Sequence, residues 1–271
     1  MNIEDIQDVI YEKEENGICT ATLNIPERKN AMSFVTFLEL ITILDDMERD
    51  KTTKVLIITG KGESFSSGGY FNMNLLTKVD QEIINEIDLQ DIAQKRLSMR
   101  FWNFTKPVIA AINGLAVGAG FTMPLIGADL IYMSDNAWIG FYFVKRAVIA
   151  EFASHFILPM YVGFQKAKEL TYFGEKINAQ KAYELGLVNK VLPREELIPF
   201  AREQALRLIP PKGPSLSIKL MKKTMHNYYK EIFSNILDLE NKGLRDLLKT
   251  HDFRESLKAL GQKRDPTFKG K

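Results

Sequence analysis

The sequence has very few of the side chains that bind metals or form disulfides. Of its 271 residues, one is a cysteine, Cys19, and three are histidines that lie far apart. A single cysteine excludes a disulfide within the chain, which agrees with a reducing compartment. No cysteine and histidine spacing of a zinc site occurs either. We therefore expect neither a metal nor a redox cofactor.

Long apolar runs and an excess of one charge are also lacking. No apolar run approaches the roughly 20 residues that span a bilayer, and the polar segment 1–8 lacks the hydrophobic core of a signal peptide. With 36 basic and 34 acidic residues, the formal net charge is +2, so the balance indicates no polyanion-binding surface. We expect a soluble, cytoplasmic protein whose partners include neither a membrane nor a nucleic acid.

What is present is a chain that can bury a substantial core, since 45% of its residues are hydrophobic. Ser33 is a plausible N-cap for a helix at 34–49, and the charged segment 80–102 is expected to be largely helical. Strands are expected at residues 9–11, 18–25, 55–59, 108–112, 130–133 and 137–140, and another is expected after a short helix that ends at Gly186. This alternation predicts an α/β fold, followed by an almost wholly helical segment after residue 152.

The most informative stretch is 106–129. Pro107 opens a short apolar run, 108–112, which is typical of a buried strand and is ended by Asn113 and Gly114. Gly118 to Gly120 then precede an apolar helix. Small residues leave the N–H groups at a helix start open to a ligand oxygen, and the helix dipole favours negative charge there. The stretch suits an anion that develops during a reaction, although tight packing of strand on helix explains the glycines equally well. The spacing is not that of a dinucleotide fingerprint.

Several motifs in this sequence resemble those of the crotonase (enoyl-CoA hydratase/isomerase) family. They are Lys106 to Gly114, Val117 to Gly120, Asn30-Ala31 after Arg28-Lys29, Phe65 to Gly69, and the segments 141–163, 179–188 and 263–270. Each motif is modest, but their order along nearly the whole chain is that of the family. The resemblance implies a crotonase-like spiral of ββα turns in residues 1–200. It also implies a C-terminal helical region, 201–271, used in a homotrimer or a dimer of trimers.

The resemblance further implies an acyl thioester of coenzyme A as substrate, so that coenzyme A enters with the substrate and no separate cofactor is required. By position, the N–H groups of Gly69 and Ala119 would form an oxyanion hole for the enolate. Preorganised donors of this kind contribute roughly 3–4 kcal/mol each. The residues implied for the coenzyme A and acyl pocket are Arg28, Lys29, Ala31, Ser66, Ser67, Gly68, Tyr70, Gly118, Thr122 and Phe143.

Some of these residues have ordinary alternatives. Arg28 and Lys29 could pair with the phosphates of coenzyme A or could be solvated loop charges. Tyr70, Phe71, Tyr142 and Phe143 could line a pocket for a bulky acyl group or could simply pack in the interior. Two departures from the family pattern are Tyr70, in place of an aspartate, and Ala147, in place of a glycine.

The acid–base residue decides which reaction is expected. Family hydratases use two glutamates, and their positions correspond to Thr122 and Phe143, neither of which is a carboxylate. Glu151 instead resembles the single glutamate of family isomerases that move a double bond from the 3 to the 2 position. One base suffices, because it can remove the proton at C2 and return it at C4. The ordinary alternative is a carboxylate at a helix N-terminus, on the same helix face as His155.

We therefore predict an enoyl-CoA isomerase in which Glu151 moves the proton. Enoyl-CoA hydration, decarboxylation or thioester hydrolysis on the same scaffold are the rival reactions. A different class of function is a catalytically silent member that binds acyl-CoA or a partner protein, because a shared fold does not establish a shared chemistry.

Overall fold

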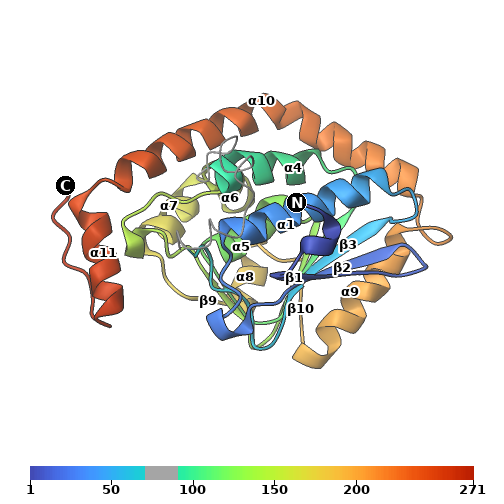
Figure 1. The fold of residues 1–271 in the computed structure, drawn as a ribbon, viewed down its shortest axis with the longest axis horizontal. Coiled ribbons are helices and arrows are strands. Elements are labelled where there is room, and N and C mark those ends of the chain that lie inside the picture. Colours follow the sequence, from blue (N-terminus) through green and yellow to red (C-terminus); the bar gives the residue numbers. More distant parts are fainter. Residues whose placement is uncertain (71–90) are drawn as a thin grey trace.

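The computed structural model describes residues 1–70 and 91–271 (Figure 1). Phe71 and residues 80–90 of the predicted helix 80–102 lie outside the described residues. The remainder of that segment is helical, with a π-helical turn at Ile92–Leu97 and helix α4 at Ser98–Asn103.

The N-terminal elements were predicted well from local pattern. After a 3₁₀ turn at Ile3–Asp5, strands β1 (Val9–Lys13) and β2 (Ile18–Leu23) form an antiparallel hairpin. A second 3₁₀ turn at Pro26–Arg28 precedes helix α1 (Phe34–Arg49). The α1 helix begins after Ser33, whose hydroxyl accepts the Thr36 N–H, so the predicted cap is confirmed.

The middle of the chain repeats a strand–strand–helix unit, and each unit contributes one strand to each of two sheets. The six-stranded sheet has the order β1-β2-β3-β5-β7-β10, and the four-stranded sheet has the order β4-β6-β8-β9. The elements of the repeat are β3 (Val55–Gly60), β4 (Ser64–Ser66), β5 (Val108–Ile112), β6 (Leu115–Val117), α5 (Ala119–Gly127), β7 (Leu130–Ser134) and β8 (Trp138–Gly140). This arrangement confirms the predicted crotonase-like α/β spiral.

Three strands were not expected from the sequence: β4, β6 and β9 (Ile177–Asn178). They contain two or three residues each, which is too short for an alternating pattern to be visible. The β4–β6 and β6–β8 pairs are parallel and join segments that are distant in sequence. Their existence therefore depends on the tertiary arrangement.

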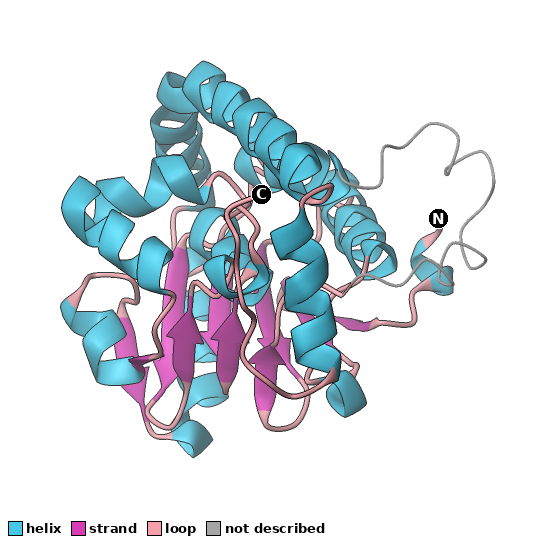
Figure 2. Cartoon of the chain, turned by 90° about the vertical axis from the view of Figure 1, so that its left-hand side faces the viewer, coloured by secondary structure: helices cyan, strands magenta, loops and turns pink. Residues whose placement is uncertain are grey.

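The central strands β3 and β5 of the six-stranded sheet are buried on both faces, as expected for parallel strands. Along β3, Val55 and Ile57 face helix α9 (Arg194–Leu208), whereas Leu56 and Ile58 face the main core beneath α1 and α5. Figure 2 shows the strands of this sheet side by side, with helices packed over them. The sheet thus forms a rigid base for the loops that follow its strands.

The C-terminal part is mainly helical, as predicted, with two short strands. Its elements are a 3₁₀ turn at Val144–Arg146, α6 (Ser154–Val162), α7 (Phe164–Phe173), β9, α8 (Ala179–Glu184), β10 (Lys190–Leu192), α9, α10 (Ser215–Leu247) and α11 (His251–Gly261). Helix α10 packs on α4, on the π-helical turn and on α6. The predicted boundary between the spiral region 1–200 and the helical region 201–271 falls inside helix α9. The division of the chain into these two regions stays a prediction.

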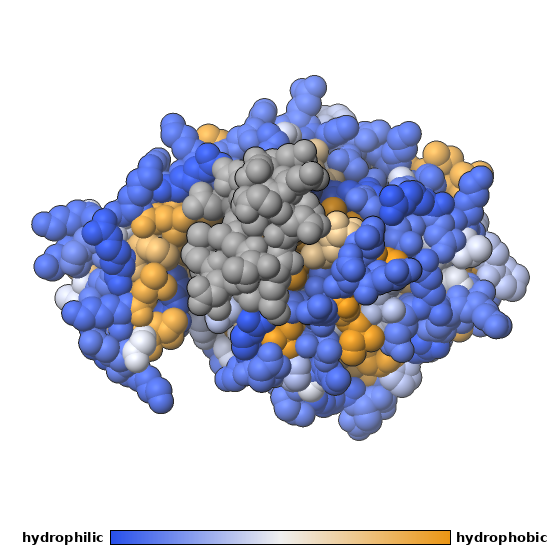
Figure 3. Space-filling view, in the orientation of Figure 1, coloured by the Kyte–Doolittle hydropathy of each residue, from blue (hydrophilic) through white to orange (hydrophobic). Residues whose placement is uncertain are grey.

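Helix α10 also carries apolar side chains that are exposed in the single chain, namely Leu216, Leu220, Met221, Met225, Tyr228, Ile232 and Leu239. Further apolar side chains gather beside α11 at the left of the molecule (Figure 3). The predicted trimer or dimer of trimers stays a prediction. Within residues 1–70 and 91–271, every helix is too short or too polar to cross a membrane.

One ion pair between a buried lysine and a partly exposed aspartate joins α10 to the body of the protein. The Lys222 ammonium donates to the Lys106 carbonyl at 3.0 Å and to Asp129 Oδ2 at 2.8 Å. The same Asp129 oxygen accepts the Val108 N–H at 2.7 Å, at the start of β5. Lys222 is 7% exposed, so removing its charge leaves the Asp129 carboxylate without its cation in a partly buried place.

We expect Lys222→Ala to lower the free energy of unfolding by about 1–2 kcal/mol in urea denaturation, because two hydrogen bonds of the ammonium are lost while Asp129 keeps access to water. The matched control is Lys223→Ala, because Lys223 is the next residue on the same helix and is exposed. We expect this control to stay within about 0.5 kcal/mol of the wild type. Equal effects of the two substitutions would show that the ion pair does not hold α10 in place.

Candidate active site

Two loops that are distant in sequence are joined through the buried side chain of Asn30. Its amide oxygen accepts the Ile25 N–H at 2.9 Å, and its amide nitrogen donates to the carbonyls of Lys61 at 2.9 Å and Ser64 at 2.7 Å. Ser66 Oγ in turn donates to the Asn30 carbonyl at 2.7 Å. The loop containing residues 28–31 therefore lies against the loop containing residues 64–70.

The residues predicted for the coenzyme A pocket meet along this seam. The Ser67 N–H donates to the Lys29 carbonyl at 2.9 Å, and Ser67 Oγ donates to the Arg28 carbonyl at 3.1 Å. Ala31 is buried on the same loop, whereas the Lys29 side chain is exposed. The structure thus brings Arg28, Lys29, Ala31, Ser66 and Ser67 together, and their role in binding stays a prediction.

Tyr70 extends this cluster. The Arg28 guanidinium lies over the Tyr70 ring, 4.4 Å from its centroid, an arrangement that favours a cation on an aromatic face. The tyrosine that stands here in place of the family's aspartate therefore packs against a half-buried arginine beside the two joined loops.

The backbone around Gly69 is held by a short parallel bridge to Met32. The Met32 N–H donates to the Gly68 carbonyl at 2.8 Å, and the Tyr70 N–H donates to the Met32 carbonyl at 2.7 Å. Because successive residues of an extended chain direct their polar groups to opposite sides, the N–H of Gly69 is directed away from Met32. A Cβ added to Gly69 would meet no atom within 4 Å.

The second predicted donor lies beside this bridge, because β4 pairs with β6. A Cβ on Gly68 would lie only 2.5 Å from the Val117 carbonyl oxygen and 3.6 Å from the Ala119 nitrogen. Ala119 is the first residue of α5, so its N–H has no acceptor within the helix. The structure therefore brings the segments that carry the Gly69 and Ala119 N–H groups together. Their role as an oxyanion hole stays a prediction.

The glycines of this region are required by close contact between backbones. A Cβ on Gly120 would lie 2.3 Å from the Ser66 carbonyl oxygen, which is closer than atoms approach without displacement. Gly118 has a φ of +56°, in the left-handed region that favours glycine. The interpretation of the glycines as tight packing is therefore confirmed, and the binding of a ligand oxygen at this helix start stays a prediction.

Thr122 and Phe143 occupy the positions implied for the two hydratase glutamates. Thr122 is fully buried, and its hydroxyl donates to the Gly118 carbonyl at 3.3 Å within the same helix. Phe143 is half-buried, and its ring lies 3.7 Å from the point that a Gly118 Cβ would occupy. These positions thus supply an internally bonded hydroxyl and an apolar wall in place of carboxylates.

Glu151 is half-buried and lies between the buried residues Ala150 and Phe152. Burial, followed by the negative charge of Glu240, raises the pKa of the Glu151 carboxyl to about 8. A carboxyl of this pKa is mostly protonated near neutrality, and its minor ionised form is a stronger base than an ordinary carboxylate.

The expected local structure around Glu151 was wrong. Glu151 does not share a helix face with His155, and it is not in the first turn of a helix, because α6 begins only at Ser154. Phe152 and Ala153 intervene with φ values of +59° and +51°, which form a left-handed turn. Ala147 also has a positive φ, +52°, which accounts for the glycine of the family pattern at this position.

Glu240 of α10 is the residue that sequence reasoning missed. Its carboxylate accepts the N–H groups of Ala153 at 2.8 Å and His155 at 3.1 Å, and it lies 2.7 Å from His155 Nδ1. The carboxylate at the start of α6 thus comes from a residue 85 positions further along the chain. A glutamate in a long charged helix has no local signal that distinguishes it from its solvated neighbours.

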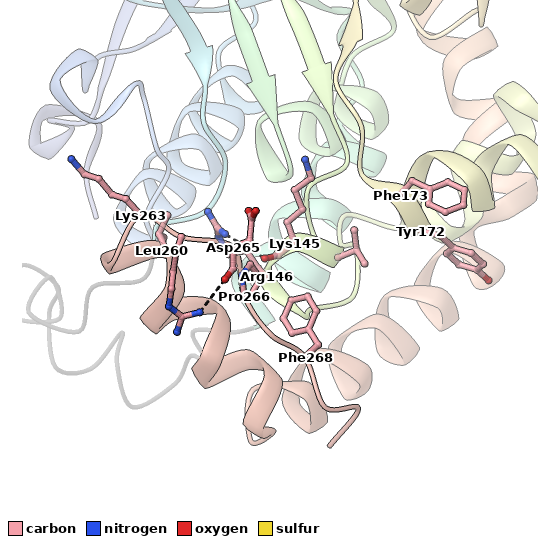
Figure 4. Close-up of a pocket in the computed structure, with 11 residues that line it drawn as sticks. Lys145, Arg146, Tyr172, Phe173, Leu260, Lys263, Asp265, Pro266 and Phe268 are labelled. Carbon is pink, nitrogen blue, oxygen red and sulfur yellow. Dashed lines mark hydrogen bonds between the residues drawn. The ribbon is translucent and has the colours of Figure 1, made fainter.

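A separate pocket of about 610 Å³ lies next to the C-terminus. Figure 4 shows that its lining comes from the turn 144–146, the end of α7, and the segment from Leu260 to Phe268. None of the residues predicted for the acyl-CoA site line it. Within the described ranges there is also no group of three His, Cys, Asp or Glu side chains that could hold a metal ion.

Comparison with known proteins agrees with the motifs and with the fold. A family model described as enoyl-CoA hydratase/isomerase matches residues 13–271. The 1,2-epoxyphenylacetyl-CoA isomerase of Escherichia coli (strain K12) is 30% identical over 272 residues, which cover 98% of this chain and 100% of that protein. The crotonyl-CoA hydratase of Syntrophomonas wolfei is 31% identical over 265 residues, which cover 97% and 98% of the two chains.

The fold has a similarly extensive counterpart among solved structures. The crystal structure of an enoyl-CoA hydratase/isomerase from Pseudoalteromonas atlantica T6c superposes with a TM-score of 0.85. The match covers 97% of this chain and 100% of that one at 25% sequence identity. Relatives of nearly equal similarity are thus named as an isomerase and as a hydratase.

The contact between Gly68 and Val117 can be tested by adding one methyl group. We expect Gly68→Ala to lower the free energy of unfolding by about 2–4 kcal/mol, because the methyl group meets a carbonyl oxygen and the φ of +97° is strained for alanine. Gly69→Ala is the matched control, since its methyl group enters open space, and we expect a change below about 1 kcal/mol. Urea denaturation of both variants measures the difference. A well-tolerated Gly68→Ala would contradict the close approach of β4 to β6.

The raised pKa of Glu151 predicts that this residue opposes stability in alkaline solution. The carboxyl ionises near pH 4.3 in the unfolded chain but only at about 8 in the folded protein. The folded state holds the proton more tightly, so the free energy of unfolding falls as the pH rises between these two values. Glu151→Gln should therefore gain about 1–3 kcal/mol over the wild type between about pH 6 and pH 9.

Urea denaturation at the two pH values measures this gain. Glu203→Gln provides the control, because Glu203 is exposed on α9 and its substitution should differ from the wild type by the same amount at both pH values. A pH-independent difference for Glu151→Gln would mean that the pKa of Glu151 is not raised.

Proposed function

Since the chain belongs to the enoyl-CoA hydratase/isomerase family, we propose that it moves the double bond of an enoyl-CoA thioester from the 3 to the 2 position. Glu151 is the base in this proposal, and the N–H groups of Gly69 and Ala119 hold the enolate oxygen. The main support is that Glu151 supplies a carboxyl with a pKa of about 8, whereas the positions of the two hydratase glutamates hold Thr122 and Phe143.

The first step removes a proton from C2 of the substrate. The ionised Glu151 carboxylate takes this proton, and the electron pair of the C–H bond moves into the thioester to form a dienolate. A thioester α-proton is too weakly acidic for this step unless the developing negative charge is stabilised. Two N–H donors fixed by backbone pairing stabilise it by roughly 3–4 kcal/mol each, because they need no reorganisation during the reaction.

The second step returns the proton to C4. The electrons of the dienolate form the bond to this proton, the double bond between C2 and C3 appears, and the Glu151 carboxylate is restored. No water and no second acid are consumed. The raised pKa of Glu151 serves both steps, because it makes the carboxylate a better base while keeping the protonated form available.

The joined loops offer a place for the coenzyme A part of the substrate. Lys29 is exposed and Arg28 is held over the Tyr70 ring, so two cations lie on the seam where phosphate groups would be bound. The acyl part would extend past Gly118 and the ring of Phe143, which lie against each other. This placement puts the thioester carbonyl between the two binding regions, at the two N–H groups.

Hydration of a 2-enoyl-CoA is the second candidate, because a relative of nearly equal similarity is named crotonyl-CoA hydratase. Hydration requires one group to activate water and one to protonate the α-carbon. Glu151 would then perform one task, and another polar group would be required for the other, since the Thr122 hydroxyl is bonded within its helix.

The deciding experiment compares wild type and Glu151→Ala on 3-enoyl-CoA and 2-enoyl-CoA substrates of several chain lengths in deuterated water. Mass spectrometry of the products distinguishes double-bond migration from addition of water. We expect the wild type to convert 3-enoyl-CoA to 2-enoyl-CoA and Glu151→Ala to lose at least about 100-fold in rate, since its proton acceptor is gone.

Retained binding provides the control for this loss. Glu151→Ala should still bind the saturated acyl-CoA in calorimetry, because the alanine leaves the proposed coenzyme A contacts in place. A 3-hydroxyacyl-CoA as the main product would favour hydration. Binding without turnover of any tested chain by the wild type would favour a catalytically silent member.

A further inference from the structure

We propose that Glu240 is a positioning residue for Glu151, because it fixes the turn that carries Glu151 and acts on it as a buried negative charge. This inference rests on the proposed role of Glu151 as the base. It adds a second glutamate, from the C-terminal helix, that touches neither the substrate nor the reacting atoms.

The Glu240 carboxylate is fully engaged with the segment that follows Glu151. One oxygen accepts the Ala153 N–H at 2.8 Å, and the other accepts the His155 N–H at 3.1 Å and lies 2.7 Å from His155 Nδ1. The residue is only 1% exposed, so water does not compete for these bonds. A carboxylate at this point also satisfies N–H groups that the start of α6 leaves without acceptors.

These bonds hold a backbone that would not persist by itself. Phe152 and Ala153 both have a positive φ, which costs roughly 1–2 kcal/mol per residue without a glycine. Phe152 is anchored by its fully buried ring, which meets Phe37 edge-to-face at 5.9 Å, and Ala153 is anchored by Glu240. Glu151 directly precedes this turn, so the turn determines the direction in which the Glu151 side chain leaves the backbone.

The part of α10 that carries Glu240 is itself held on both sides. Asn241 donates to Asp91 Oδ1 at 2.8 Å, and the Asp238 carboxylate pairs with the Lys95 ammonium at 2.7 Å. A Cβ on Gly243 would lie 3.0 Å from Ile149 Cδ1, so the segment before Glu151 also lies against this helix. Glu240 therefore acts from a firmly held position.

The Glu240 carboxylate acts on two titratable groups of the segment 151–155. His155 Nδ1 lies 2.7 Å from one of its oxygens, and its negative charge reaches Glu151, whereas Asp238 on the same helix is paired with Lys95. The like charge of Glu240 adds to burial, which is the larger cause, in raising the pKa of Glu151 to about 8. Removing this charge while keeping the shape should lower that pKa, and burial should still keep it above the ordinary value.

The test is a pH titration of the Glu151 carboxyl by ¹³C NMR in the full-length protein, with labelled glutamate. The signal is assigned by its loss in Glu151→Ala. We expect Glu240→Gln to move the midpoint down by roughly half to one pH unit. The acidic limb of the pH profile of kcat/KM for 3-enoyl-CoA should move in the same direction by the same amount. A residue with a purely structural role would lower the rate without moving either midpoint.

Two further variants distinguish the effect of the Glu240 charge from the effect of its hydrogen bonds to the turn after Glu151. Glu231→Gln removes a carboxylate from an exposed position on the same helix, and we expect it to leave the midpoint unchanged. Glu240→Asp keeps the charge but shortens the side chain, so we expect kcat to fall while the midpoint stays near that of the wild type. If Glu240→Gln lowers the yield of folded protein, the titration is repeated in an Ala153→Gly background, where glycine accepts the positive φ unaided.

An unchanged Glu151 midpoint in folded Glu240→Gln overturns this inference. The titration does not depend on turnover, so this failure is distinct from a failure of the proposed function, which would appear as full activity of Glu151→Ala.

Discussion

The parallel pairing of β4 with β6 is the interaction on which the candidate site depends. It joins two strands of three residues that are distant in sequence, and it brings Gly68 against the Val117 carbonyl and Gly120 against the Ser66 carbonyl. Contacts this close exclude any side chain, so the backbones themselves form the site. Two N–H groups can then lie side by side without a flexible side chain to order, which is the form of preorganisation that stabilises a developing oxyanion.

A second constraint comes from two glutamates that share one buried region. Glu151 is half-buried before α6, and Glu240 of α10 is almost fully buried at the start of the same helix. Burial, and after it the like charge of Glu240, disfavour the ionised form of Glu151, so this carboxyl retains its proton to a higher pH. The same conflict yields a carboxyl poised for proton transfer near neutral pH. Burial of Glu151 thus lowers the stability of the folded protein at high pH and at the same time makes the Glu151 carboxylate a stronger base.

Sequence reasoning succeeded where a signal was local. The cap at Ser33, the hairpin of β1 and β2 and the buried strand β5 follow from residue types within a few positions. It failed for β4, β6 and β9, and the alternative that placed Glu151 on a helix face with His155 was wrong. In both cases the outcome depended on a distant partner, either another strand or the Glu240 carboxylate, which no neighbouring residue indicates.

The sequence by itself determined the family, most of the strands and helices, and the candidate residues, because motifs and periodicity are properties of neighbouring residues. Only the tertiary structure decided that the segments bearing the Gly69 and Ala119 N–H groups meet, that Tyr70 supports Arg28, and that Glu240 reaches the turn after Glu151. These features arise when the sheets and α10 pack. The reason is physical: the close backbone contacts of Gly68 and Gly120 and the effect of the Glu240 charge on Glu151 both require the chain to be folded.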